Sequence, residues 1–257
     1  MTAGRWDPDP IESLVIAMAD QIRPGETWGV GMSTHLPLVA LSLCRAVRGF
    51  DFKIYLPEQG VYLVRRGVGG TSPAGLLDGV RPYPVPVTEV FNEDLGPRYG
   101  EFFRPAQLDA DGRLNIARVR GRLVVGYAGI AEAMARYDRV FAYTARHDRR
   151  FFVGAVDVIT ADMMARADGT RRRSATVLTN LGVFDLEPEH KHLRVRYLYP
   201  STSLAHVRDA TGIEVACDEA APRQDPRPDR LRLLREHVDA GRARDREAAR
   251  GAARGIR

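Results

Sequence analysis

Apolar residues recur at helical spacing at the start of the chain. They recur every three or four residues from Pro10 to Ile22, and Pro24-Gly25 follows, so the pattern predicts an amphipathic helix. A second, more apolar helix is predicted from Pro37 to Val47. Short apolar runs at Glu26–Gly31 and Phe52–Leu56 predict buried strands before and after that helix.

The second half of the chain alternates short runs of β-branched or aromatic residues with polar connections, which predicts further strands. A helix is predicted from about Ala131. The predicted strands are Leu123–Gly126, Arg139–Ala142, Phe151–Val158, Ser174–Thr179 and Leu193–Leu198. Alternation of strands with helices predicts an α/β fold, with an open, mainly parallel sheet and flanking helices.

Two segments depart from this alternation. Residues 67–100 are rich in glycine and proline, which predicts a long loop that is either functional or mobile. The C-terminal segment is rich in arginine and alanine, and one helical stripe runs through Leu231. We therefore predict one α/β domain over residues 1–220 and a helical segment over residues 221–257, frayed beyond Gly241. Deletion of residues 241–257 is then expected to change neither activity nor assembly.

Composition and charge exclude several classes of protein. The net charge is +5, and the segment from Arg223 to Arg257, with 11 arginines and 6 acidic residues, accounts for all of it. The rest is neutral, so charge gives no reason to expect a nucleic-acid partner. No apolar run approaches the roughly 20 residues that span a bilayer, and the first ten residues do not read as a signal peptide. Cys44 and Cys217 lie far apart and suit a reduced, cytoplasmic protein without a zinc site.

The usual catalytic motifs are weak or missing. Gly29-Val30-Gly31 lacks the third glycine of a dinucleotide-binding turn, so a tight turn that lets the helix pack on the sheet is favoured. The six histidines show no metal-binding spacing except His190-Lys191-His192, where a solvated loop or strand edge is favoured. No Gly-x-Ser-x-Gly motif is present, and no metal site is predicted.

Glu58 is the carboxylate best placed for chemistry. It follows the predicted strand Phe52–Leu56 and precedes Gln59-Gly60, and ligands gather at such strand ends in open α/β sheets. An ionised carboxylate can attack an activated carbonyl without a general base. From these residues alone, a turn or capping residue is favoured. Asp157 is a second candidate, for which a buried structural hydrogen-bonder is favoured.

The segment Gly126-Tyr127-Ala128-Gly129 precedes the predicted helix at Ala131. Small residues let a ligand approach the backbone, and amides at the start of a helix can stabilise an oxyanion. An ordinary turn is the alternative.

The chain contains, in this order, the segments Phe52–Gly60, Ala106–Asn115, Arg150–Thr160, Asn180–Asp185 and Val207–Val215. Together they resemble the B (β) subunit of family I CoA-transferases of the glutaconate type. Phe52–Gly60 is similar to the strand that carries the Glu-x-Gly motif, and Ala106–Asn115 to the motif A-Q-x-D-x-x-G-x-x-N. Arg150–Thr160 resembles the segment F-V-x-x-V-D-x-x-T. Asn180–Asp185 and Val207–Val215 match the C-terminal pattern, which also resembles B subunits of steroid-ring-opening CoA-thioester hydrolases.

The resemblance implies a covalent mechanism. Glu58 would attack an acyl-CoA and form first an acyl-glutamyl anhydride and then a glutamyl-CoA thioester. Oxyanion stabilisation and CoA binding would fall to Gly126, Ala128, Gly129 and Gly60. The CoA thioester is a substrate, and no permanently bound cofactor is implied. A separate A subunit would be the partner and would help to exclude water.

Two departures leave other functions open. Tyr127-Ala128 stands where the family usually has Gly-Gly, and residues 61–103 are unlike the family pattern, so the acceptor acid is not implied. The same crevice could hydrolyse or cleave a cyclic acyl-CoA, or the chain could be a non-catalytic, acyl-CoA-sensing subunit. The presence of Glu58 within Glu-x-Gly favours the transferase. The C-terminal arginines could also contact the partner or the CoA phosphates, although a solvated helix is favoured.

Overall fold

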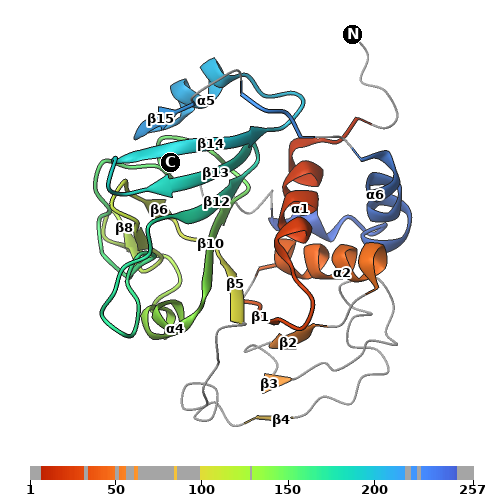
Figure 1. The fold of residues 1–257 in the computed structure, drawn as a ribbon, viewed down its shortest axis with the longest axis horizontal. Coiled ribbons are helices and arrows are strands. Elements are labelled where there is room, and N and C mark those ends of the chain that lie inside the picture. The colour runs from red at the N-terminus through yellow and green to blue at the C-terminus, as the bar shows by residue number, and fades with distance from the viewer. Residues whose placement is uncertain are drawn as a thin grey trace. The chain divides into compact units, whose positions relative to one another are not determined.

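The chain folds into two compact units (Figure 1). The computed structural model describes residues 7–31, 34–49, 52–55, 61–62, 84–85, 99–127, 129–217, 221–224 and 227–247. The first unit contains residues 1–93, 98–101 and 225–257, and the second contains residues 94–97 and 102–224. Both ends of the chain therefore belong to the same unit.

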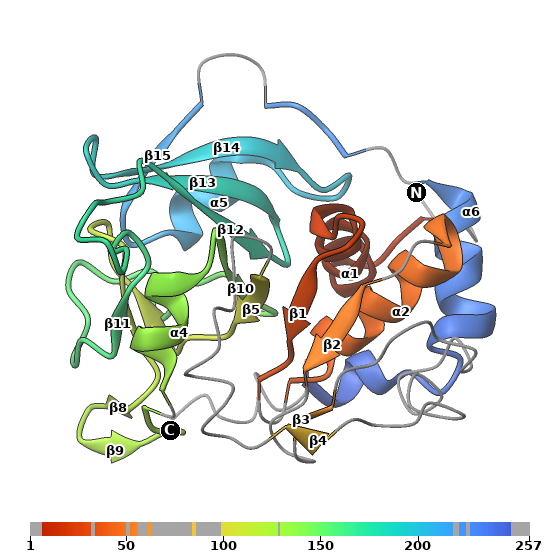
Figure 2. The ribbon, with the colours of Figure 1, turned by 60° about the horizontal axis from the view of Figure 1, so that its bottom comes forward.

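Helices α1 (Pro10–Gln21) and α2 (Leu36–Arg48) pack against each other in the first unit (Figure 2). Asp9 begins α1 with a capping box, in which its carboxylate accepts from the amides of Ile11 and Glu12 while the Glu12 carboxylate accepts from the Asp9 amide. Gly49, at φ +63°, ends α2 in the left-handed region. Both predicted helices are confirmed.

The main strands of the first unit run parallel. β1 (Thr27–Gly29) pairs with β2 (Lys53–Tyr55) on one side and with the start of β5 (Tyr99–Phe103) on the other. The strands predicted over residues 26–31 and 52–56 are thus confirmed at their centres. β3 (Val61–Tyr62) and β4 (Pro84–Val85) form a separate antiparallel pair.

The second unit mixes parallel and antiparallel pairs. β10 (Arg139–Thr144) runs parallel to β12 (Ala175–Thr179), and β12, β13 (Gly182–Glu187) and β14 (His192–Leu198) form an antiparallel meander. β15 (Glu214–Ala216) pairs with β14 in parallel and forms the edge of this group of strands. Strands predicted at 139–142, 174–179 and 193–198 are confirmed. The predicted α/β class, with mostly parallel strands, is also confirmed. The flanking helices include α4 (Ile130–Arg136) and α5 (Leu204–Ala210).

Short strands make up the rest of the second unit. β7 (Arg113–Asn115) lies between β6 (Gln107–Leu108) and β11 (Ala161–Asp162), and β8 (Arg118–Val119) forms a hairpin with β9 (Arg122–Leu123).

Two predicted strands are wrong. Residues 151–158 form turns apart from an isolated bridge at Phe152, because the Asp148 carboxylate accepts from the amides of Arg150 and Phe151 and fixes a turn there. The strand predicted over 123–126 stops at Leu123, since the next three amides bond to the Ala117 and Ile116 carbonyls.

The C-terminal segment packs onto α1 and α2. It contains α6 (Pro228–Leu233) and a π-helical turn, η1 (Leu234–Val238). Arg244 is 1% exposed and Glu247 is 1% exposed, so the expectation of fraying beyond Gly241 is wrong for residues 241–247. Residues 248–257 lie outside the described part of the chain.

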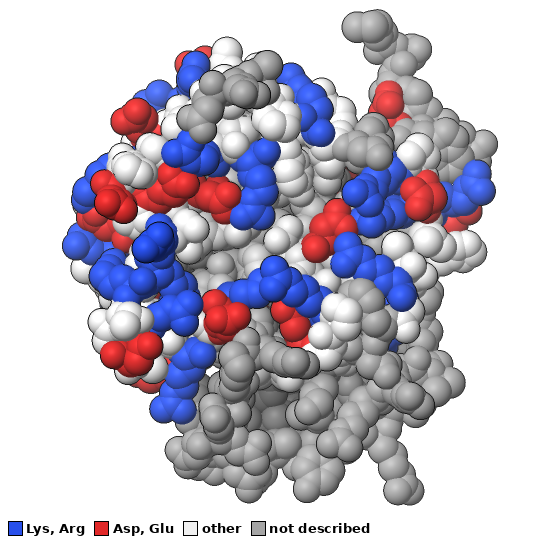
Figure 3. Space-filling model, in the orientation of Figure 1, with Lys and Arg blue, Asp and Glu red and all other residues white. Residues whose placement is uncertain are grey.

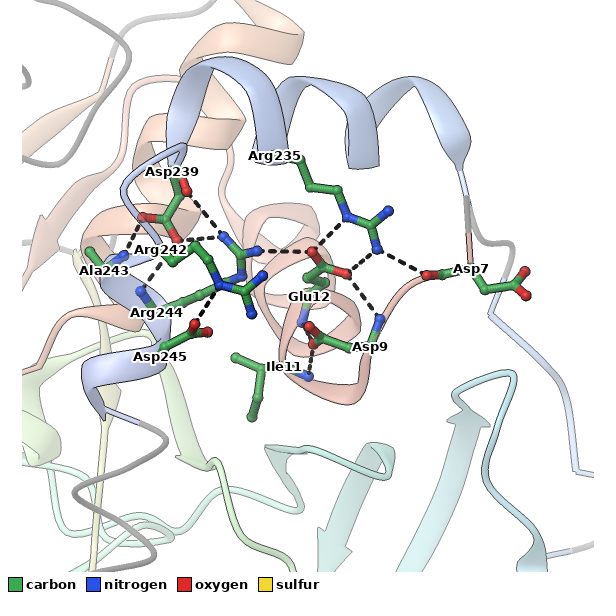
Figure 4. A network of polar contacts seen from close by, with 10 residues as sticks. All are labelled: Asp7, Asp9, Ile11, Glu12, Arg235, Asp239, Arg242, Ala243, Arg244 and Asp245. Carbon is green, nitrogen blue, oxygen red and sulfur yellow. Dashed lines mark hydrogen bonds and ion pairs between the residues drawn. The ribbon is translucent and has the colours of Figure 1, made fainter. Parts of the chain in front are cut away.

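A buried ionic network joins this segment to α1 (Figure 4). Arg244 donates to Glu12 at 3.0 Å and to Asp239 at 2.8 Å, and all three side chains are almost fully buried. Arg235 donates to both oxygens of Glu12, at 2.8 and 2.7 Å. Glu247 accepts from the amides of His35 and Leu36, at 2.6 and 2.8 Å, and so caps the start of α2.

Charges of both signs are interspersed on the described surface in Figure 3. Many arginines of the described residues pair with a neighbouring acid, as Arg194 does with Glu187 and Arg171 with Asp162. This mixture matches the neutral body expected from the sequence. None of the helices described by the structure is long and apolar enough to cross a bilayer.

The backbone at Gly212 passes so close to the backbone of Phe152 that no side chain fits at this position. A β-carbon at this position would lie 2.0 Å from the carbonyl oxygen of Phe152, and a backbone atom cannot move aside cheaply. We expect Gly212→Ala to lower the free energy of unfolding by about 3 kcal/mol in urea titrations. Gly154→Ala is the control, because a β-carbon there meets nothing within 4 Å, and its expected change is within about 0.5 kcal/mol. Equal effects of the two substitutions would contradict this account.

Candidate active site

The carboxyl ends of β1 and β2 lie in register with the middle of β5. Gly29, at the end of β1, pairs with Tyr55 of β2 and with Glu101 of β5. Paired residues of neighbouring parallel strands lie about 4.8 Å apart, so these three positions form one short row. Glu58 follows Tyr55 by three residues in the sequence. Glu58 and Gly60 themselves lie outside the described residues, so their site roles stay predictions.

The Glu101 carboxylate lies against the Gly29-Val30-Gly31 turn. A β-carbon at Gly29 would stand 2.7 Å from its Oε2, and one at Gly31 would stand 3.4 Å from its Oε1. Thr34 donates to the Gly31 carbonyl oxygen at 2.5 Å and closes the turn before α2. Sequence reasoning missed Glu101, although the aromatic residues of Tyr99–Phe103 are typical of a strand.

The second predicted element is the turn before α4. Gly126 has φ +121° and Gly129 has φ +69°, conformations that favour glycine. The Gly126 amide donates to the Ile116 carbonyl at 3.2 Å, so this residue shapes the turn while its amide is engaged. Ala128 lies outside the described residues.

Large apolar side chains are exposed around this turn. We call Leu123, Val125, Tyr127 and Ile159 the apolar turn patch; their exposed fractions are 68, 47, 57 and 57%. Hydrogen bonds link the segments that carry these side chains, because the amides of residues 125 and 126 donate to the Ile116 carbonyl and the Ile116 amide donates to the Thr160 hydroxyl.

Comparison with known proteins identifies the family. The chain is 34% identical over 247 residues to the cholesterol ring-cleaving hydrolase IpdB subunit of Mycobacterium tuberculosis, which covers 92% of this chain and 97% of that protein. It is 26% identical over 251 residues to the B subunit of glutaconate CoA-transferase from Acidaminococcus fermentans, covering 90% and 93%. The chain belongs to the CoA-transferase family, as a B (β) subunit. The family expected from the sequence motifs is therefore confirmed.

Solved structures agree with this assignment. IpdAB of Rhodococcus jostii RHA1 matches with a TM-score of 0.77 and 25% identity, covering 93% of this chain and 98% of that one. The decarboxylase AibA/AibB matches with a TM-score of 0.73 and 25% identity, covering 94% and 99%. A scan against models of protein families gave no match. Relatives with this fold are therefore named for different reactions, as a CoA-transferase, a hydrolase and a decarboxylase.

The motif Ala106–Asn115 of this CoA-transferase subunit builds the base of the β8–β9 hairpin. Asn115 donates to Gln107 at 2.7 Å and to the Arg118 carbonyl at 2.6 Å, and Gln107 donates to Asp157 at 3.1 Å. Asp157 also accepts from the Arg120 amide at 2.6 Å, which lowers the pKa of the Asp157 carboxyl, with a further contribution from Gln107. Asp157 is exposed in a turn, so its interpretation as a buried strand residue is wrong, while its hydrogen-bonding role is confirmed.

The C-terminal motif has a structural role around His147. The His147 ring lies 3.0 Å from the Thr179 hydroxyl and 2.7 Å from that of Thr211, which donates to the Val207 carbonyl at 2.6 Å. Burial lowers the pKa of His147 to about 3, so the imidazole ring is neutral at pH 7 and does not act as a general acid at that pH.

The remaining histidine motif is a surface turn. His190 and Lys191 lie exposed in the β13–β14 turn, and His192 contacts Glu187 at 2.8 Å. This agrees with the solvated interpretation. Among the described residues, no three His, Cys, Asp or Glu side chains gather as a metal site would require.

Proposed function

We propose that this chain is the β subunit of a heteromeric CoA-transferase that moves CoA between an acyl-CoA and a carboxylic acid. One observation carries the proposal. In a chain of the CoA-transferase family, β2 runs parallel to β1 and ends at Tyr55, three residues before Glu58 in the sequence, and ligands bind beyond the carboxyl ends of strands in open α/β sheets. The substrates are a CoA thioester and a carboxylic acid, with no permanently bound cofactor.

The first step of CoA transfer needs only one ionised carboxylate, which acts as the nucleophile. Glu58 attacks the thioester carbonyl, and CoA leaves as a thiolate. The thiolate then attacks the resulting anhydride at the glutamyl carbonyl, which releases the free acid and leaves a glutamyl-CoA thioester. The acceptor acid reverses both steps. We assign oxyanion stabilisation and CoA contact to Ala128, Gly129 and Gly60, with Gly126 setting the shape of its turn.

An A subunit is the proposed partner. Relatives such as IpdAB and AibA/AibB are named as two-component proteins. The apolar turn patch supports the proposal, because its four large apolar side chains are 47–68% exposed, and exposed apolar surface of this kind is typical of a site that a partner covers. A bound A subunit would also help to keep water from the activated intermediates. We further propose a cytoplasmic location, which suits the two free cysteines.

Replacement of Leu123 by aspartate is expected to weaken the affinity for the A subunit about 10- to 100-fold, because a charge would be buried where an apolar side chain fits. Copurification and sedimentation of the coexpressed proteins measure the effect. Leu123→Met is the matched control, since it keeps apolar volume. Normal assembly of both variants would place the partner elsewhere.

Mass spectrometry of the copurified complex tests the transferase proposal. After incubation with a panel of acyl-CoAs and rapid quenching, we expect a CoA-sized adduct on the peptide that contains Glu58. Consumption of an acyl-CoA by a folded complex with no such adduct would reject the proposal.

The second candidate is hydrolysis or ring cleavage of a cyclic acyl-CoA. The 34% identity to an IpdB subunit favours it. It predicts incorporation of solvent oxygen into the product without exchange of CoA between acids. Isotope-labelled water therefore separates the two functions.

A further inference from the structure

The β8–β9 hairpin projects from the second unit (Figure 2). Residues 118 and 120–123 are exposed, and Val119 is half-buried. We call residues 118–123 the arginine arm. A two-stranded hairpin with neither face covered is only marginally stable by itself in water. The arm is therefore the kind of element that a partner stabilises by covering it.

Hydrogen bonds hold the arginine arm in a fixed shape. Arg120, at φ +49°, and Gly121, at φ +77°, form its two-residue turn, although arginine rarely adopts this conformation. The Asp157 carboxylate accepts from the Arg120 amide at 2.6 Å. The Arg118 guanidinium donates to the Gly121 carbonyl oxygen at 3.2 Å. An arm that is already in shape loses little conformational freedom when a partner covers it.

The arginine arm carries positive charge on both faces and at its tip. Arg118 lies opposite Leu123, and Val119 lies opposite Arg122. Successive side chains of a strand point to opposite faces, so Arg118 and Arg122 point to opposite faces of the hairpin. Arg120 occupies the turn between them.

No acid of the described part of the chain pairs with these guanidinium groups. Elsewhere in the second unit exposed arginines pair with an acid, as Arg171 does with Asp162. The three arginines of the arm form no ion pair with a described residue. Asp157 experiences the charge of Arg120 but bonds to its backbone amide. The arm therefore presents an excess of positive charge to whatever covers it.

The covering surface must be both acidic and apolar. Leu123 is 68% exposed on the same face as Arg118, and it also belongs to the apolar turn patch. A phosphate group would reach one face or the tip, whereas a groove on a protein encloses both faces, and arginine beside apolar side chains is typical of protein interfaces. A second copy of this chain is a poorer complement, because many of its acids already pair with its own arginines.

We propose that the arginine arm inserts into an acidic groove on the A subunit; this rests on the A subunit as the proposed partner. Carboxylates of the groove pair with the guanidinium groups on both faces of the arm, while Leu123 continues the apolar contact of the turn patch. Opposite charges on two surfaces speed their association, and dissolved salt screens them. The affinity between the subunits should therefore fall as the salt concentration rises.

Dilution of the coexpressed complex tests the arm, with dissociation followed by sedimentation at about 0.05 M and about 0.5 M salt. The double variant Arg118→Glu with Arg122→Glu reverses one charge on each face. We expect its affinity for the A subunit to be at least about tenfold weaker than that of the wild type at the lower salt concentration. The loss of affinity with salt should be strong in the wild type and absent in the double variant. Replacement of the same two arginines by lysine keeps the charge and should keep the affinity within about threefold and the salt dependence.

Arg208→Glu is the matched control, because it makes the same charge change at an exposed position on α5. Its affinity for the A subunit is expected to stay within about twofold of the wild type. Urea unfolding of every variant checks that the chain is folded, and a loss of affinity counts only for a variant with the wild-type midpoint.

Several results would overturn the role of the arm. Unchanged affinity and salt dependence in the glutamate variant would reject it, as would an equal loss of affinity in the lysine variant. Normal assembly with weakened binding of CoA would assign the charges to the phosphates of CoA instead. Loss of self-association alone would assign them to a second copy of this chain. A wild-type chain that does not associate with the A subunit would reject the proposed partner itself.

Discussion

Replacement of Glu58 by glutamine is expected to lower CoA transfer by at least about 10³-fold and to abolish the CoA adduct, because an amide cannot form the acyl anhydride. The substitution keeps the size of the side chain, so the complex with the A subunit should assemble normally. The transfer of CoA from an acyl-CoA to a panel of acids measures the rate, and intact mass measures the adduct.

Glu189→Gln is the matched control for this experiment. It makes the same chemical change at an exposed position in the β13–β14 turn, and its transfer rate is expected to stay within about twofold of wild type. Normal function of Glu58→Gln would favour the non-catalytic, acyl-CoA-sensing interpretation. Loss of the adduct together with unchanged consumption of acyl-CoA would favour the ring-cleaving alternative.

The sequence predicted the elements whose residues alternate or repeat locally. α1, α2 and the strands β1 and β2 follow directly from apolar periodicity, because each buries one face against a neighbour. The motif order was also sufficient to identify the family. These are local properties, which a single chain displays without knowledge of its tertiary contacts.

Residues 151–158 show where local pattern misleads. Their apolar composition is typical of a strand, yet Phe151 and Phe152 are buried from within a turn that Asp148 fixes. Leu108, more than 40 residues earlier in the chain, also holds the segment: its amide donates to the Phe151 carbonyl, and its carbonyl accepts from the Val153 amide. Glu101 was missed for a related reason, since its significance depends on register with Gly29 rather than on its neighbours.

The arginine-rich C-terminal segment gives the clearest difference between composition and structure. From the sequence its charge predicted a solvated helix, whereas Arg244 is fully enclosed by Glu12 and Asp239. Glu12 and Arg244 are 232 residues apart in the sequence, so the local sequence around either residue does not indicate that they form an ion pair. Charge counts alone therefore could not separate buried arginines from exposed ones.

Glu12 is held in its charged form by this network. Burial by itself raises the pKa of Glu12, but hydrogen bonds from Arg235 and the Asp9 amide, with the charges of Arg235 and Arg244, more than offset it. The pKa therefore lies below the ordinary value of 4.5. A carboxyl whose pKa is lowered by folding adds stability above its unfolded value and loses it as the pH falls through its folded value.

Substitution of Arg244 by alanine is therefore expected to lower the free energy of unfolding by about 3–5 kcal/mol at pH 7, because it leaves two buried carboxylates short of their cation. Arg242→Ala is the control in the same segment: its side chain is 61% exposed, and its pair with Asp245 is expected to contribute less than about 1 kcal/mol. Urea unfolding measures both variants. The loss of unfolding free energy in Arg244→Ala should shrink as the pH falls below 4.5 and Glu12 takes up a proton in either protein.

Deletion of residues 241–257 should lower the free energy of unfolding by at least as much as Arg244→Ala, because it also removes the Glu247 cap from α2. A deletion that leaves stability unchanged would contradict the packed arrangement.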